Sequence, residues 1–103
     1  MRELHLYDNM LSGAIPTGIG KLRALKLLYL ESNQLSQTIP AEIGNCVNLE
    51  DMGLYTNLLT GTIPSTFEAL WKLRRMWVSR NALTGGFPSV LLKMPSLQDI
   101  YLD

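Results

Sequence analysis

Apolar residues recur with a period of 24 residues along the whole chain. The recurrence is clearest at the first, fourth and sixth positions of each period. These positions hold Met1, Leu25, Leu49, Leu73 and Leu97; Leu4, Leu28, Met52, Met76 and Ile100; and Leu6, Leu30, Leu54, Val78 and Leu102. Because positions 4 and 6 alternate with more variable residues, we expect a short β-strand near the start of each period, with its apolar side chains facing inward. A period of this length indicates a solenoid in which each coil adds one parallel strand.

The middle of each period carries an Asn at position 9, a Leu at position 11 and a Pro at position 16. The Asn column consists of Asn9, Asn33, Asn57 and Asn81, and the Pro column consists of Pro16, Pro40, Pro64 and Pro88. An inward Asn donates two hydrogen bonds and accepts others, so the stacked amides are expected to form a structural ladder where the chain leaves the sheet. Pro suits the start of a short helical turn. The segment behind it is too short for a stable α-helix, which predicts one 3₁₀-like turn per repeat.

The repeats divide the chain into residues 1–24, 25–48, 49–72, 73–96 and the partial repeat 97–103. All of them belong to one domain spanning residues 1–103. One repeat alone buries too few apolar side chains to offset the entropy of ordering it, so its stability depends on its neighbours. The expected fold class is therefore an α/β solenoid with a parallel sheet on one face and short 3₁₀ turns on the other.

Composition excludes several classes of partner. The chain has 9 basic and 9 acidic residues and no net charge. Nothing in that balance indicates a nucleic-acid partner. No apolar run is long enough for a membrane-spanning helix, so direct insertion into a membrane is not expected. The first eleven residues carry charges where a signal peptide has its apolar core. The single cysteine, Cys46, is expected to be buried and excludes both an internal disulfide and a cysteine-based zinc site.

Candidate catalytic chemistry is sparse. His5 is the only histidine, and Glu3 and Asp8 are its nearest acidic neighbours on the expected outward side of the strand. No serine or cysteine nucleophile stands at an outward position of the terminal repeat that holds His5, and no glycine-rich phosphate loop is present. The sequence therefore predicts no catalytic residue, no metal site and no cofactor. It also contains no N-x-[ST] glycosylation acceptor.

The outward positions of the expected strand vary between repeats and concentrate aromatic and charged residues. Position 5 reads His5, Tyr29, Gly53, Trp77 and Tyr101, and position 8, at the end of the strand, reads Asp8, Ser32, Thr56 and Arg80. Because Gly53 has no side chain, we expect a dip between the rings of Tyr29 and Trp77. The predicted ligand-binding patch is Tyr29, Gly53, Tyr55, Arg75, Trp77 and Arg80, rich in the residue types of binding hot spots. The alternative is that the aromatic pairs only stabilise the sheet.

The whole pattern, LxxLxLxxNxLxGxIPxxxGxLxx, resembles the plant-type leucine-rich repeat, and residues 1–24 match it apart from Met1 at the first Leu. The resemblance implies a right-handed superhelix with its parallel β-sheet on the concave face. It also implies a role like that of receptor-like kinase and receptor-like protein ectodomains, which bind a protein or peptide ligand and in some cases a co-receptor. Alternatives within the same resemblance are a secreted enzyme inhibitor, similar to polygalacturonase inhibitors, and an intracellular scaffold. The implied location is the extracellular face of the plasma membrane, as part of a larger protein, with the cytoplasm as the alternative.

Some residues depart from the repeat. Gln37 replaces Gly at position 13, Glu68 and Leu92 replace Gly at position 20, and Phe87 replaces Ile at position 15. The paired-cysteine caps of the family are absent, Met1 stands at a core position, and Asp103 is expected within the fifth strand. These features suggest a piece of a longer array, whose parent could carry a kinase domain elsewhere. An Arg-x-Arg pair at positions 5 and 7, with which some receptors of the family bind a peptide carboxylate, is also absent.

Overall fold

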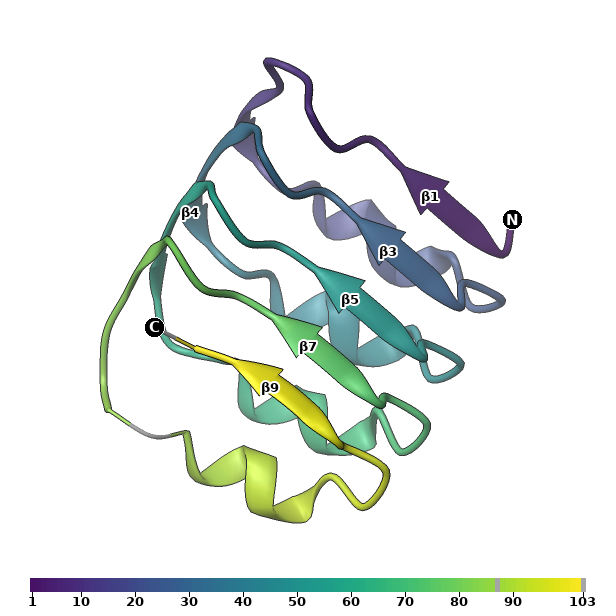
Figure 1. Cartoon of the computed structure of the whole chain (residues 1–103). Helices are drawn as coiled ribbons and strands as arrows, with labels where there is room; N and C mark the ends of the chain where they lie inside the picture. The colour runs from purple at the N-terminus through teal and green to yellow at the C-terminus, as the bar shows by residue number, and fades with distance from the viewer. Residues whose placement is uncertain (87, 103) are drawn as a thin grey trace.

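The chain forms a short coil in which every repeat makes one full turn (Figure 1). The structure is a computed structural model that describes residues 1–86 and 88–102. Phe87 and Asp103, which carry the expectations for position 15 of the fourth repeat and for the end of the fifth strand, lie outside the described residues. The principal extents are 33 × 33 × 21 Å, as expected for a few stacked coils.

One short strand from each repeat joins the first sheet. The sheet has the order β1-β3-β5-β7-β9, and all of its strands are parallel. Its strands are β1 (Glu3–His5), β3 (Leu27–Tyr29), β5 (Asp51–Gly53), β7 (Arg75–Trp77) and β9 (Asp99–Tyr101). Each residue of a strand pairs with the residue 24 positions further along the chain, as in Leu4↔Leu28 and Leu28↔Met52. This arrangement confirms the predicted concave sheet.

The apolar columns meet inside the coil. Leu28, Met52 and Leu54 are each at most 1% exposed. The core is closed in the middle repeats and open at the first one, where Leu6 is 39% exposed and lines an apolar hollow of about 410 Å³ with Leu4 and Leu11. Stability therefore depends on contacts between repeats and decreases toward the first coil.

A second parallel sheet occupies a segment that the sequence analysis did not assign to any strand. Its strands, in the order β2-β4-β6-β8, are β2 (Ser12–Ala14), β4 (Gln34–Thr38), β6 (Leu58–Gly61) and β8 (Ala82–Leu83). Here the paired residues are 22 apart, as in Gly13↔Leu35 and Gln37↔Leu59. The 24-residue columns of the sequence therefore do not coincide with the pairing in this sheet.

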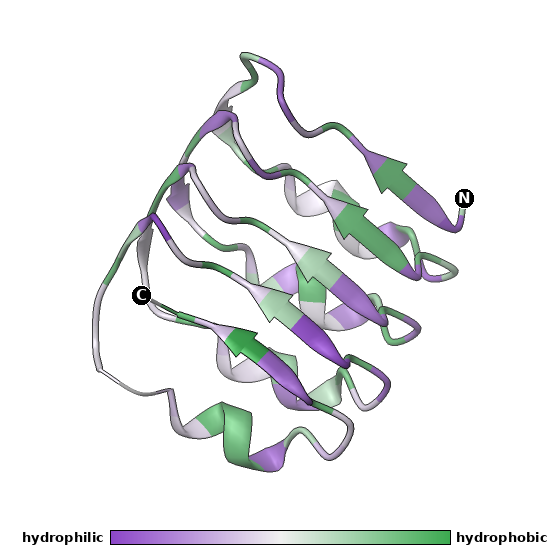
Figure 2. Ribbon diagram, viewed as in Figure 1, coloured by the Kyte–Doolittle hydropathy of each residue, from purple (hydrophilic) through white to green (hydrophobic). Residues whose placement is uncertain are grey.

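A 3₁₀ helix follows the proline at position 16 of each full repeat and closes the back of the coil, behind the first sheet in Figure 1. The four helices are η1 (Thr17–Lys21), η2 (Ala41–Asn45), η3 (Ser65–Ala69) and η4 (Ser89–Lys93). The preceding proline is the N-cap, with φ between −72° and −62°. Its carbonyl accepts a hydrogen bond three residues on, as in Ile19 N to Pro16 O at 3.1 Å. The predicted turns are confirmed, and η4 is the most hydrophobic of them in Figure 2.

Gln37 shows what the departure at position 13 does to the backbone. Gly13 and Gly61 occupy this position with φ of 81° and 78°, and Gln37 adopts the same left-handed conformation with φ of 66°. A residue with a Cβ pays roughly 1–2 kcal/mol for that conformation. The fold is therefore kept at the second repeat at a local cost.

Candidate ligand-binding face

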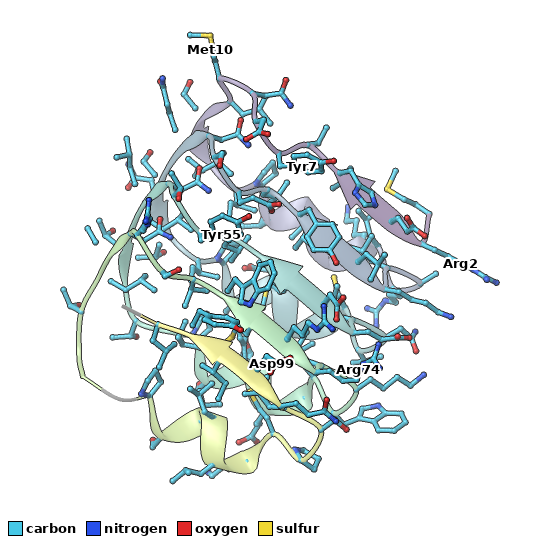
Figure 3. The ribbon with its side chains drawn as sticks, in the orientation of Figure 1. Arg2, Tyr7, Met10, Tyr55, Arg74 and Asp99 are labelled. Carbon is cyan, nitrogen blue, oxygen red and sulfur yellow. The ribbon has the colours of Figure 1, made fainter. Side chains whose placement is uncertain are left out.

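Register within the first sheet places the variable positions in straight columns across the concave face. The pairing puts Glu3, Leu27, Asp51, Arg75 and Asp99 in one column, and His5, Tyr29, Gly53, Trp77 and Tyr101 in the next. Residues at positions 7 and 8 lie beyond the strands, which end at position 5. In Figure 3 the labelled Tyr7, Tyr55 and Asp99 lie over this face, whereas Met10 projects from the far end of the first repeat.

A left-handed residue turns the chain away from the sheet at position 8 of each repeat. Asp8, Ser32, Thr56 and Arg80 have φ between 55° and 58°. The Asn that follows fixes this bend. The side-chain nitrogen of Asn57 donates to Leu30 O at 3.0 Å, and its oxygen accepts from Leu35 N at 3.0 Å. The amides of Asn33 and Asn81 make equivalent bonds across repeats, and Asn9 bonds within its own repeat.

The aromatic residues of the face form two separate clusters. In the N-terminal cluster the His5 ring lies 6.1 Å from Tyr7 and 5.1 Å from Tyr29, measured between ring centroids. In the C-terminal cluster Trp77 lies 5.6 Å from Tyr55 and 5.4 Å from Tyr101, in edge-to-face geometry. These contacts stabilise the sheet by about 0.5–1.5 kcal/mol per pair and hold the rings in fixed orientations.

Gly53 lies between the clusters, but the expected open dip above it is wrong. A Cβ at Gly53 would lie 2.7 Å from Glu31 Oε1 and 3.1 Å from Tyr29 Cδ1. The Glu31 side chain and the Tyr29 ring therefore lie over the glycine and bury it. Glu31 stands at position 7 of the second repeat and is not one of the predicted patch residues. In the structure it is 8% exposed, and its Oε1 has no hydrogen-bond partner.

The hollow on this face lies nearer the C-terminus than predicted. It has a volume of about 330 Å³ and is lined by Tyr55, Thr56, Trp77, Ser79, Arg80 and Tyr101. Three residues of the predicted patch, Tyr55, Trp77 and Arg80, line it together. Thr56, Ser79 and Tyr101 were not in the predicted patch, although they occupy the outward columns that carried the signal.

The other three predicted residues have different surroundings. Arg75 stands beside Asp99, with 3.5 Å between Nε and Oδ2, and does not line the hollow. The Tyr29 hydroxyl donates to Asp51 Oδ2 at 3.1 Å. Burial, together with this bond to a carboxylate, raises the pKa of Tyr29 to about 12. Tyr29 therefore stays protonated and acts as a hydrogen-bond donor at neutral pH.

Electrostatics on the face is dominated by carboxylates. Burial raises the pKa of Glu31; a hydrogen bond from its own backbone N–H lowers it, the neighbouring Asp8 raises it, and His5 lowers it. The pKa of Tyr55 is raised by burial and by the charges of Glu31 and Asp8. The charge of Glu31 thus raises the pKa of both Tyr29 and Tyr55, one from each aromatic cluster.

Groups with catalytic or metal-binding potential are few. His5 Nε2 lies 3.0 Å from Glu3 Oε1 on an exposed edge. The buried Cys46 thiol donates to Ile19 O at 3.2 Å, and burial raises its pKa, so it is a poor nucleophile. Within residues 1–86 and 88–102, no three His, Cys, Asp or Glu side chains gather as a metal site would require. No helix in this described part has the length and hydrophobicity needed to cross a membrane.

Comparison with known proteins agrees with the coil. The Leucine Rich Repeat family model matches residues 1–22 and 24–46. The chain is a leucine-rich repeat protein of the plant type. No curated protein sequence matches it.

Three solved structures superpose on nearly the whole of this leucine-rich repeat chain. A TDR receptor matches with 31% identity and a TM-score of 0.96, over 99% of this chain and 18% of that one. The Arabidopsis receptor kinase HAESA ectodomain, in complex with an IDA peptide hormone ligand, matches with 34% identity and a TM-score of 0.89, over 94% of this chain and 17% of that one. A plant ice-binding protein matches with 33% identity and a TM-score of 0.94, over 100% and 34%. The chain thus spans about a third or less of each of these proteins.

Proposed function

We propose that this chain is a ligand-recognition segment of a receptor-like protein at the cell surface, and that it binds a peptide or protein on its concave face. The observation that carries the proposal is the hollow in which Tyr55, Trp77 and Arg80 meet. Tyr, Trp and Arg are the residue types most enriched in binding hot spots. Their rings are held edge to face, so little side-chain entropy is lost on binding.

The fold alone does not choose this ligand class. The same coil occurs in the HAESA ectodomain, solved in complex with a peptide hormone ligand, and in an ice-binding protein. Function therefore has to be argued from the residues on the face. Half-buried aromatic rings around a polar hollow suit the side chains of a peptide, because each ring offers apolar area together with a hydrogen-bonding edge.

A selection from a displayed library of random 12-residue peptides tests the proposal. Peptides that bind this chain should lose at least about 2 kcal/mol of affinity, roughly 30-fold, in Trp77→Ala. The matched control is Trp71→Ala. Trp71 is 56% exposed in the turn between η3 and β7, with Lys72 Nζ 5.0 Å from its ring, and it does not line the hollow.

Stability has to be measured alongside affinity, because Trp77 also contacts Tyr55 and Tyr101. Urea unfolding should show that Trp77→Ala remains folded, with a loss of about 1–3 kcal/mol for the two aromatic contacts. Selected peptides that tolerate Trp77→Ala but not Trp71→Ala would show that the proposed face is wrong. A selection that yields no specific peptide would refute peptide recognition by this segment.

A further inference from the structure

We propose that the concave face takes a cationic side chain, an arginine or lysine of a basic peptide, at Glu31 above Gly53. This inference rests on the proposed peptide recognition and specifies its chemistry. It places the charged contact of the ligand between the two aromatic clusters, beside the hollow lined by Tyr55 and Trp77.

Charge is segregated on this molecule although the chain as a whole is neutral. Of the 9 acidic and 9 basic residues, the concave columns within the described part hold five of the former and two of the latter. The acidic ones are Glu3, Asp8, Glu31, Asp51 and Asp99, and the basic ones are Arg75 and Arg80. Asp99 already neutralises Arg75 at 3.5 Å. The face therefore attracts a cationic partner during encounter.

Glu31 is the acidic residue of this set that is most clearly left incomplete. It is 8% exposed, and Oε1 is enclosed without any hydrogen-bond partner. A buried acceptor without a donor is rare in native proteins and needs an explanation. Water has already been removed from this oxygen, so a cation that pairs with it gains the attraction without a further desolvation cost on the protein side.

The surroundings of Glu31 suit a cation in two more ways. Asp51 Oδ1 is likewise buried without a partner, and the Tyr29 hydroxyl donates to Asp51 Oδ2. The charge of Glu31 raises the pKa of both Tyr29 and Tyr55, so both aromatic residues lie near this carboxylate. Aromatic faces near a carboxylate bind guanidinium and ammonium groups through cation–π contact as well as through the ion pair. The titratable groups of the neighbouring repeat that act on the pKa of Glu31 are Asp8, which raises it, and His5, which lowers it.

Gly53 is the residue that makes this cation-binding site possible. Every other described residue at position 5 carries a ring, and a Cβ at position 53 would lie 2.7 Å from the Glu31 carboxylate. A side chain there would push Glu31 off the sheet. Because Gly53 has no side chain, there is room for the Glu31 carboxylate at the centre of the face, where the sequence predicted an empty dip.

An NMR titration tests the proposed cation-binding site at Glu31 directly. The uniformly ¹⁵N-labelled protein is titrated with the capped tripeptide Ac-Gly-Arg-Gly-NH₂ and, separately, with its neutral citrulline analogue. We expect saturable shifts at the Trp77 indole N–H and the Gly53 amide with the arginine peptide, and at least tenfold weaker binding of the citrulline peptide. Equal binding of the two peptides, or no saturable shift with arginine, would overturn the proposal.

Variants locate the contact. Glu31→Gln should weaken the arginine peptide at least tenfold, and Asp51→Asn should weaken it less. The matched control is Glu42→Gln, since Glu42 lies exposed in η2 at the back of the coil. Gly53→Ala, which displaces the carboxylate without removing it, should weaken binding as well. Loss of binding in Glu42→Gln, or unchanged binding in Glu31→Gln with an unchanged urea midpoint, would contradict the assignment.

The displayed library separates this inference from the function on which it rests. Selected peptides should be enriched in Arg or Lys and should lose affinity in both Trp77→Ala and Glu31→Gln. Selected peptides could instead lose affinity in Trp77→Ala, keep it in Glu31→Gln and carry no excess of basic residues. That outcome would support concave-face recognition and refute the cation-binding site. Binding of the arginine peptide, with no peptide selected from the library, would support the cation site at Glu31 and refute the proposed recognition of longer peptides.

Discussion

Asn57 makes all of its side-chain hydrogen bonds to backbone atoms of its own repeat and of the preceding one. Its amide nitrogen donates to Leu30 O and Leu54 O at 3.0 and 3.1 Å, and its oxygen accepts from Leu35 N at 3.0 Å. The residue is 6% exposed, so water cannot replace these partners. One side chain thus satisfies the backbone where two consecutive coils leave the concave sheet.

Asn57→Ala should therefore strand several buried backbone groups. Each of them costs about 1–3 kcal/mol, and the total loss of unfolding free energy should reach at least about 3 kcal/mol. Urea unfolding measures it. Asn9→Ala is the matched control, because Asn9 is exposed and donates only to Leu6 O and Tyr7 O of its own repeat. If both variants unfold at the wild-type midpoint, the ladder does not contribute to stability.

At the scale of elements, two glycines determine how closely the 3₁₀ helices stack. A Cβ at Gly20 would lie 2.7 Å from Glu42 O, and a Cβ at Gly44 would lie 2.6 Å from Thr66 O. Both obstacles are backbone atoms of the next helix, which cannot move without moving the coil. Glu68 has a Cβ at the same position, so η3 and η4 are unable to approach each other as closely. The replacement of Gly by Glu68 therefore alters the spacing on the convex side and leaves the concave sheet in register.

Gly44→Ala should destabilise the protein by about 1–3 kcal/mol, because the new methyl group overlaps the η3 backbone. Gly18→Ala provides the comparison. Gly18 lies in η1, and a methyl group added there would meet nothing within 4 Å, so alanine should be neutral or slightly stabilising through its lower chain entropy. Calorimetric or urea unfolding of the pair decides the matter. Equal effects at both positions would mean that the close approach between η2 and η3 does not limit packing.

The elements that could be predicted from the sequence are those whose signal repeats at the 24-residue period. The alternation of Leu28 and Leu30 predicted the concave strands, and the proline column predicted the 3₁₀ turns. The second sheet could not be predicted in the same way. Its strands pair at a 22-residue offset, as in Ser36↔Leu58, so its partners do not share a column of the repeat.

The candidate site was predicted only in part for a related reason. Trp77, Tyr55 and Arg80 come together because Trp77 ends β7 and the other two follow just beyond β5 and β7. Glu31 escaped because the strand ends at position 5, and a side chain at position 7 no longer follows the strict alternation. Its direction depends on the free space over Gly53, which is a contact between repeats and not a pattern within one.

Across the whole molecule, burial changes from one end of the coil to the other. Leu54 is fully buried in the third repeat, whereas Leu6, at the equivalent position of the first, is 39% exposed. β1 and β9 each pair with one neighbouring strand, and the three strands between them each pair with two. In a solenoid, stability is a sum over neighbouring coils, so the outer coils are expected to open at lower free energy than the central ones.

Hydrogen exchange measures this gradient amide by amide. Protection should be strongest at Met52–Leu54 and weaker at Leu4–Leu6 and Ile100–Leu102, because opening an outer coil breaks one interface and opening the central coil breaks two. Light scattering on the same sample is the control, since stacking of two copies through the apolar hollow at Leu4, Leu6 and Leu11 would protect the first coil. Dilution should then lower the protection of Leu4–Leu6 and leave that of Met52–Leu54 unchanged. Uniform protection in a monomer would instead show that all the coils unfold as one cooperative unit, and that the exposed first repeat is stabilised by more than its visible contacts.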